Sequence, residues 1–242
     1  MTKFKKIIPA LCMLLISAVL MGTSTYAWFS MNTSVKASGM KVTAESKETF
    51  LLISSTKTTA DEIKQEGGTS VNFNMSDEQS KVKPAAHEDT ATNTASTNKD
   101  AAWYYKVGTS YTDGTGTNKT ALNIADIGGY VIHKTVYVTL ANGSVVQDKL
   151  TVTAKIVKNG ADGTDITAAK VLVTSETGAA EFGSTDTAPK DIYTGDINST
   201  SVITLDIWIY YDGNNTNVTS ANFANLASAS IELTFDVSKT AA

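Results

Sequence analysis

The stretch "YVIHKTVYVTLANG" (residues 130–143) indicates the fold class most clearly. It is rich in β-branched and aromatic side chains, and it ends in Asn142-Gly143, a dipeptide typical of two-residue hairpin turns. The next apolar segment, "KLTVTAKIV" (residues 149–157), is the expected partner across that turn. Together they predict two neighbouring antiparallel strands.

The same alternation of apolar segments and turns recurs along the chain. Further strands are expected at residues 49–55, 70–75, 102–111, 170–175, 201–211 and 230–237. Helical periodicity is confined to a short helix at residues 59–65 and another at 220–228, and the chain has only three prolines. Many short strands separated by Gly, Asn and Asp turns predict an all-β, antiparallel sandwich over residues 39–242.

One long segment does not follow this pattern. Residues 76–100 consist largely of Ser, Thr, Ala, Asn, Lys and Asp, with a single Val and no Leu, Ile or aromatic residue. Such a composition buries too little apolar surface to offset the entropy of ordering. A mobile low-complexity loop is therefore expected, and nothing near His87 in the sequence indicates a site.

Residues 1–27 have the features of an export signal. Lysines at positions 3, 5 and 6 precede an apolar run over residues 7–21, and Thr25-Tyr26-Ala27 provides a small-x-small site for cleavage before Trp28. The alternative is an uncleaved membrane anchor, because no charge occurs over residues 7–34. Cleavage predicts a secreted protein that contacts the membrane only before processing.

The composition of the chain argues against disulfide bonds and against nucleic acid as a partner. The single cysteine, Cys12, lies inside the signal, so the mature chain of 215 residues cannot form disulfides. All 20 basic residues are lysines, and the mature chain carries 17 of them against 24 acidic residues, a formal charge of −7. An acidic surface without arginine argues against nucleic acid as a partner.

The motifs of common enzymes are missing from the sequence. The two histidines, His87 and His133, are far apart, and "HEDTA" has Ala91 where a zinc-protease helix needs its second ligand. We expect no catalytic residues, no cofactor and no metal site. The acidic segments at residues 159–165 and 212–217 are interpreted as plain turns, although calcium binding by such a turn stays open.

The expected mature N-terminus has the pattern of a half-buried strand. Phe29, Met31, Thr33, Val35 and Ala37 alternate with polar residues, and Trp28 precedes them. After Gly39 the alternation changes phase, which predicts a bulge or kink. This strand can pair within its own subunit or with another copy of the chain, and the pattern alone does not decide between them.

"GTSTYAWFSMNTSVKASGMKV" (residues 22–42) resembles the N-termini of the TasA/camelysin family of Gram-positive bacteria. The resemblance rests on a T-[WY]-A-x-F core at residues 25–29 and an A-S-G-x turn at residues 37–40. It implies cleavage by a signal peptidase of the SipW type and a jelly-roll-like sandwich. It also implies a secreted subunit of extracellular or biofilm-matrix fibres, polymerised head to tail with its own copies.

In the family's scheme, the mature N-terminal segment enters the next subunit as a donor strand. The corresponding side chains in this sequence are Trp28, Phe29, Met31, Thr33, Val35 and Ala37. Residues 205–237 resemble, more weakly, the closing segment of clostridial surface proteins, but Tyr210 and Tyr211 replace the Glu and Gly of their "WxEGxD" turn. The protease activity claimed for camelysin is not carried over, because the metal ligands are missing.

The alternative function is a cell-surface adhesin or glycan-binding module. If exposed, a set of aromatic residues could form a sugar-binding platform: Trp103, Tyr104, Tyr105, Trp208, Tyr210 and Tyr211. Alternate positions of a strand face the core, however, so part of this set is expected to be buried.

Overall fold

The computed structural model describes residues 41–46, 51–74, 82–89, 96–111, 120–158, 166–218 and 229–240. All of them lie within one compact unit, Ser38–Ala242. The expected signal segment, the cleavage site and the proposed donor strand (residues 28–38) lie outside the described residues, and so does the helix expected at residues 220–228.

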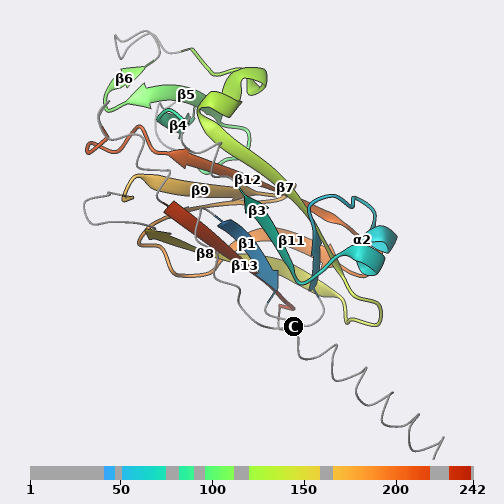
Figure 1. The fold of residues 1–242 in the computed structure, drawn as a ribbon. Coiled ribbons are helices and arrows are strands. Elements are labelled where there is room, and N and C mark those ends of the chain that lie inside the picture. Colours follow the sequence, from blue (N-terminus) through green and yellow to red (C-terminus); the bar gives the residue numbers. More distant parts are fainter. Residues whose placement is uncertain are drawn as a thin grey trace, which may run out of the picture. The chain divides into compact units, whose positions relative to one another are not determined.

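Two five-stranded sheets face each other across a shared core (Figure 1). Sheet A consists, in spatial order, of β11 (Lys190–Ile197), β8 (Gln147–Lys158), β13 (Ala229–Ser238), β1 (Lys41–Ser46) and β3 (Ser70–Asn74). Sheet B consists of β10 (Ala179–Gly183), β9 (Ala169–Thr174), β12 (Ile203–Tyr211), β7 (Val131–Leu140) and β2 (Leu51–Ser54). The expected all-β sandwich is confirmed.

One pair of strands departs from the expected antiparallel arrangement. Strand β1 runs parallel to the last strand, β13, with Val42 opposite Ile231 and Ser46 opposite Phe235. On its other side β1 pairs with β3 in the antiparallel sense. The first described strand of the chain is therefore inserted between β13 and the edge strand of sheet A.

The expected hairpin between residues 130–141 and 149–157 is wrong. Strand β7 pairs with β12 and β2 in sheet B, whereas β8 pairs with β13 and β11 in sheet A. The chain does turn at Asn142-Gly143, where Gly143 has φ 82, and the next residues carry it across to the other sheet. The Asn-Gly turn reverses the direction of the chain. The two strands that it joins nevertheless lie in different sheets, and each buries its apolar face against the core between them.

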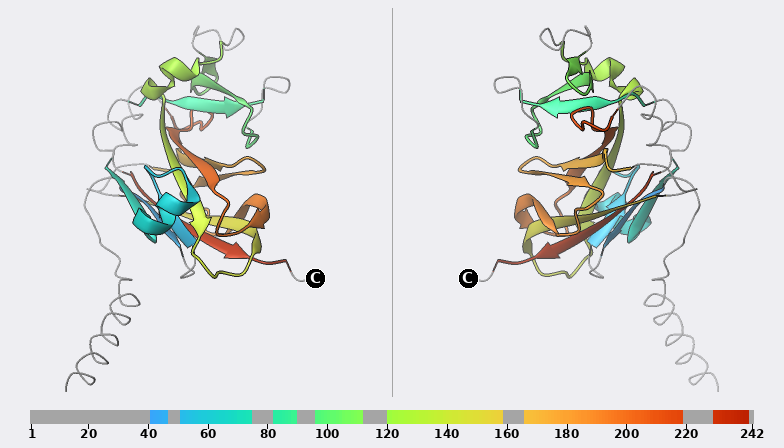
Figure 2. Two further views of the ribbon diagram at one scale, coloured as in Figure 1. Left: turned by 90° about the vertical axis from the view of Figure 1, so that its right-hand side faces the viewer. Right: turned by 90° about the vertical axis from the view of Figure 1, so that its left-hand side faces the viewer.

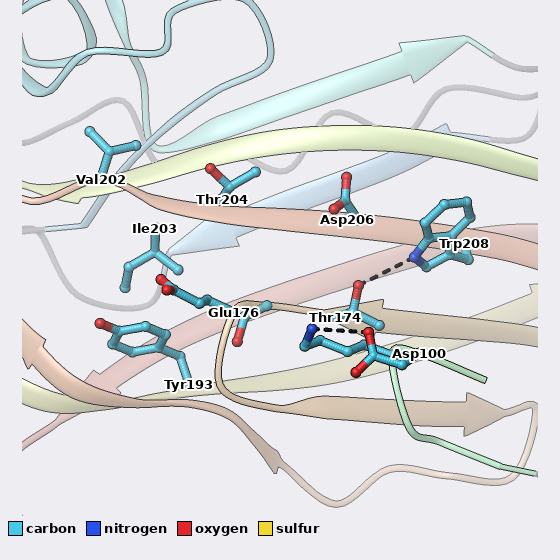
Figure 3. A pocket seen from close by; sticks show the side chains of 11 residues that line it. Asp100, Thr174, Glu176, Tyr193, Val202, Ile203, Thr204, Asp206 and Trp208 are labelled. Carbon is cyan, nitrogen blue, oxygen red and sulfur yellow. Dashed lines mark hydrogen bonds and ion pairs between the residues drawn. The ribbon is translucent and has the colours of Figure 1, made fainter. Parts of the chain in front are cut away.

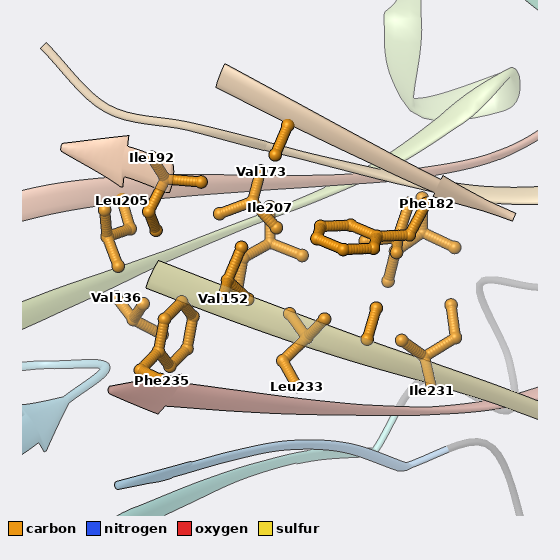
Figure 4. Packing of buried hydrophobic residues seen from close by; sticks show 14 of the residues in the cluster. Val136, Val152, Val173, Phe182, Ile192, Leu205, Ile207, Ile231, Leu233 and Phe235 are labelled. Carbon is orange, nitrogen blue, oxygen red and sulfur yellow. The ribbon is translucent and has the colours of Figure 1, made fainter. Parts of the chain in front are cut away.

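Alternation along the strands builds the core between the sheets (Figure 4). On β12, Leu205 and Ile207 are fully buried, and on β13 Leu233 and Phe235 are fully buried as well. Each such side chain contributes about 1.5–3 kcal/mol by leaving water. These buried side chains are therefore a main source of stability for the sandwich.

A third, small sheet covers part of the outer face of sheet B. It consists of β4 (Ala85–Glu88), β5 (Ala102–Val107) and β6 (Ser110–Tyr111). A second apolar cluster joins it to sheet B, in which Ala85 and Trp103 pack with Leu172 and Tyr210. Figure 2 shows this layer beyond β9 and β12, on the side of sheet B away from sheet A.

The expectation of a mobile loop over residues 76–100 is wrong for Val82 and the residues that follow it up to Asp89. Strand β4 lies in this segment, and Ala86, His87 and Glu88 are all buried. The composition of this segment did not predict a strand, because β4 has few large side chains of its own. It is buried by Trp103 and by sheet B. Residues 75–81 and 90–95 lie outside the described residues.

Two short helices complete the described elements. Helix α2 (Ala60–Glu66) confirms the helix expected at residues 59–65, and Thr59 caps its N-terminus by accepting from the Glu62 amide. The 3₁₀ helix η1 (Ile124–Gly129) precedes β7, and Ile127 packs in the second apolar cluster.

Candidate functional site

The small sheet ends partway across sheet B, and a cleft of about 410 Å³ opens beside it. Its floor comes from the outward side of β12, where Thr204, Asp206 and Trp208 follow one another at alternate positions (Figure 3). Thr174 on β9 lies directly opposite Asp206. Period-two alternation therefore produces an apolar inner face and a polar outer face on the same strand.

Asp206 is held in place by two side chains of the neighbouring strand β7. His133 Nε2 and Thr135 Oγ1 each lie 2.8 Å from Asp206 Oδ1. These bonds, with the one from His133 contributing most, hold the pKa of Asp206 below its ordinary value against the opposing effect of burial. Both bonds use Oδ1, so among the described residues Oδ2 remains available to a ligand.

Trp208 closes one end of the cleft in a fixed orientation. The His133 ring stacks on it with centroids 3.7 Å apart and an interplanar angle of 7°. The indole Nε1 donates to Thr174 Oγ1 at 3.3 Å. One histidine thus orients both the carboxylate and the aromatic ring.

The rim of the cleft is formed by Lys99 and Asp100, and buried His87 anchors the segment that carries them. His87 Nδ1 lies 2.6 Å from the Ser96 carbonyl oxygen, and its Nε2 lies 3.2 Å from that of Ala101. The Ser96 amide donates to the His87 carbonyl in return, at 2.9 Å. His87 therefore has a positioning role that its surroundings in the sequence did not indicate.

Both acceptors of His87 are carbonyl oxygens, so only the protonated ring can donate to both. Burial nevertheless lowers the pKa of His87, opposed by the two carbonyl bonds and by the Glu181 carboxylate. The Trp103 ring lies against it at 4.4 Å between centroids. The neutral ring satisfies one of the two carbonyls, and protonation adds the second bond at the cost of a buried charge.

Two further sets of ionisable side chains pair with one another in and beside the small sheet. Lys106 Nζ lies 2.7 Å from Glu88 Oε1 across the small sheet. Glu181 accepts from Lys170 at 3.0 Å and from the hydroxyl of Tyr210, whose pKa burial raises well above its ordinary value. Within the described ranges, no group of three His, Cys, Asp or Glu side chains is arranged to hold a metal ion.

The acidic turn after β12 is closed by hydrogen bonds to Asp212. Asp212 Oδ1 accepts from the Asn214 amide at 2.9 Å, and the Asp212 carbonyl accepts from the Asn215 amide. Burial raises the pKa of Asp212 above its ordinary value. The turn expected at residues 159–165 lies outside the described residues.

The expected aromatic platform is wrong as a set. Trp103, Tyr104, Tyr210 and Tyr211 are buried, and only Trp208 of the six lines the cleft. Sequence reasoning also missed Asp206, although alternation along "TLDIWIY" places it on the same face as Trp208. No pattern along the chain relates Glu176, Tyr193 and the rim residues to that strand.

A second feature of the described structure is the set of four edges of sheets A and B, three of which are obstructed. The pairing of β11 shifts register between Asp191 and Tyr193, and again after Thr194. Next to it, the turn before β10 lies against β11, where the Ser175 hydroxyl donates to the Ile192 carbonyl. At the edge of sheet B, Ile53 of β2 exchanges two backbone hydrogen bonds with Gly68. Bulges and covering segments of this kind protect edges from pairing with other chains.

The fourth edge is β3, whose described residues carry no register shift. Its pairing with β1 is regular from Ser70, opposite Glu45, to Asn74, opposite Lys41. Val71 and Phe73 are partly buried and pack against the main core. Within the described residues, sheet A ends at this strand.

The site residues predicted from the sequence all lie outside the described residues, so they have no place in this geometry. They are Thr25, Ala27, Trp28, Phe29, Met31, Thr33, Val35 and Ala37. In the described part of the chain, no helix is both long and apolar enough to cross a membrane.

Comparison with known proteins gave little information. Neither a family model nor a curated protein matches this chain. One solved structure, described as "AvmM Catalyzes Macrocyclization in Alchivemycin A Biosynthesis", is similar over 46% of this chain and 82% of its own, at 8% identity. The TM-score of 0.26 is too low to carry a statement about fold or function.

Proposed function

We propose that this chain is a secreted structural subunit, without catalytic activity, of extracellular-matrix or surface fibres. Polymerisation occurs by donation of the N-terminal strand, from Trp28 to Ala37, to the next subunit. Signal cleavage before Trp28 releases this strand, and a peptidase of the SipW type performs the cleavage.

The observation that carries the proposal is the regular edge at β3. An extended peptide adds to such an edge through backbone hydrogen bonds, and its alternate side chains enter pockets beside the core. Val71 and Phe73 pack against that core from the edge strand itself. The alternating apolar side chains of Phe29, Met31 and Val35 have the spacing that such pockets accept.

The energetics of strand addition are favourable. Each large apolar side chain that leaves water contributes about 1.5–3 kcal/mol, so Trp28, Phe29 and Met31 contribute several kcal/mol in total. The contact is head to tail and does not close on itself, so repeated addition produces a filament.

A competing peptide tests the proposal without altering the fold. A synthetic peptide of residues 28–37, added in excess to the mature protein, should occupy the acceptor edge and shorten or abolish fibres seen by negative-stain electron microscopy. The matched control is the same peptide with Phe29→Asp and Met31→Asp, which should leave the fibres unchanged.

Deletion of residues 28–35 is the complementary experiment. The shortened protein should remain monomeric by size-exclusion chromatography and form no fibres. Fibres that persist after this deletion, or that resist the competing peptide, contradict the donor-strand mechanism.

A further inference from the structure

We propose that the cleft beside Trp208 binds a short saccharide and prefers sugars that carry an amino group. The proposal concerns a different face of the molecule from β3 and does not rest on polymerisation. It would give the protein a means of binding polysaccharide whether or not it forms fibres.

The cleft is preorganised on three sides. His133 and Thr135 fix Asp206, and the His133 ring and Thr174 fix Trp208. His87, a buried residue of β4 in the small sheet, fixes both ends of the rim segment. These side chains are already ordered before a ligand binds, so binding costs little of their conformational entropy.

The polar groups that remain available suit a polyhydroxylated ligand. Thr204 and Glu176 are exposed side chains of the cleft and have no partner among the described residues. Asp206 Oδ2 likewise has no donor there. Carboxylates accept strong hydrogen bonds from ligand hydroxyls, and a threonine hydroxyl both donates and accepts.

Not every hydroxyl in the cleft is available. Ser175 Oγ donates to the Ile192 carbonyl and accepts from the amides of Thr177 and Gly178, so its role is structural. The aromatic residues Trp208 and Tyr193 are both partly exposed, and they supply apolar surface for the C–H faces of a sugar ring.

Tyr193 depends on a glycine two residues further along the chain. Gly195 has φ 144, and a Cβ at this position would lie 3.1 Å from the Tyr193 hydroxyl oxygen. A side chain here would strain the backbone and crowd the ring on the β11 side of the cleft.

Charge decides which sugars are preferred. The positive charge of Lys99 is paired with Asp100 at 3.1 Å, which leaves the carboxylates of Glu176 and Asp206 to define the potential of the cleft. A protonated amine on the ligand is attracted to such a site, and a carboxylate is repelled. The volume of about 410 Å³ falls within the roughly 300–1,000 Å³ of small-molecule sites.

Isothermal titration calorimetry of the mature protein tests this inference with three tetrasaccharides, of glucosamine, N-acetylglucosamine and galacturonic acid. We expect the affinity to fall in that order, with no binding of the acidic sugar. Any other order, no binding of any sugar, or equal binding of a lysine tetrapeptide overturns the proposal.

Variants of the two carboxylates of the cleft, Asp206 and Glu176, locate the site. Asp206→Asn should weaken glucosamine binding about tenfold, as expected for the loss of one charge-assisted hydrogen bond. Glu176→Gln should weaken it several-fold and, because this side chain is exposed and unpaired, should leave folding intact. Glu232→Gln is the matched control, an exposed carboxylate on β13 of sheet A. Unchanged affinity in both cleft variants, or an equal loss in the control, rejects the cleft as the site.

Discussion

At the residue scale, two histidines determine the geometry of the cleft from opposite sides. His133 is a surface residue that orients Asp206 and Trp208 at once. His87 is 2% exposed and bonds to both ends of the segment that carries Lys99 and Asp100. A short polar rim is held in position because one buried ring reaches two backbone carbonyls.

The lowered pKa of His87 predicts a loss of stability in mild acid. The unfolded state binds a proton near pH 6.5, while the folded state binds it only at lower pH because of burial. The unfolded state therefore binds more protons in this window, and the free energy of unfolding falls as the pH drops below about 6.5 through the folded pKa.

The measurement is urea denaturation of the mature protein and of His87→Gln at pH 7.5 and pH 5. Glutamine does not titrate, so the variant should lose less stability between the two pH values than the original protein. Equal losses in the two proteins would show that His87 does not contribute to the acid sensitivity.

At the element scale, the turn after β12 attaches the small sheet to the sandwich. The Asp212 amide donates to the Ala168 carbonyl at 2.7 Å, and the Gly213 amide donates to the Ala85 carbonyl of β4 at 2.8 Å. Gly213 passes so close to β5 that a Cβ would lie 2.0 Å from the Lys106 carbonyl oxygen. Only glycine permits this approach, because the obstacle is backbone.

Gly213→Ala should therefore destabilise the protein by about 1–3 kcal/mol, as overpacking against a fixed neighbour does. The control is Gly128→Ala in η1, where an added Cβ meets nothing within 4 Å. The midpoints of urea denaturation measure both changes. Equal midpoints for the two variants would mean that the turn moves away from β5 without cost.

Strand positions were largely predictable from the sequence, but strand neighbours were not. Alternation identified β7, β8, β12 and β13, because their apolar residues recur at every second position. Alternation does not show whether β7 and β8 lie in one sheet or in two, because each strand buries the same side chains in either arrangement. Strand β11 was missed because it carries two register shifts and exposes half of its residues.

At the scale of the whole molecule, the cleft was unpredictable because it joins distant parts of the chain. Asp206 and Trp208 lie on β12, while Lys99 and Asp100 belong to a segment about a hundred residues earlier in the sequence. Their meeting depends on β4, whose small residues gave no strand signal. The two features with proposed functions, the cleft and the β3 edge, lie on different sheets, so binding and polymerisation can be measured separately.

Polymerisation as proposed requires that residues 28–37 pair with another subunit and not with their own. Disulfide trapping tests it directly, because the mature chain has no cysteine of its own. The double variants are Asn32→Cys or Ser34→Cys on the polar side of the donor segment, each combined with Ser70→Cys, an exposed residue of β3. The control combines Ser34→Cys with Lys155→Cys, an exposed position on β8.

After mild oxidation, non-reducing gel electrophoresis distinguishes the two arrangements. Pairing between subunits predicts a ladder of covalent multimers for at least one of the double variants and none for the control. A disulfide formed only within monomers, with no ladder for either double variant, would contradict donor-strand polymerisation at the β3 edge.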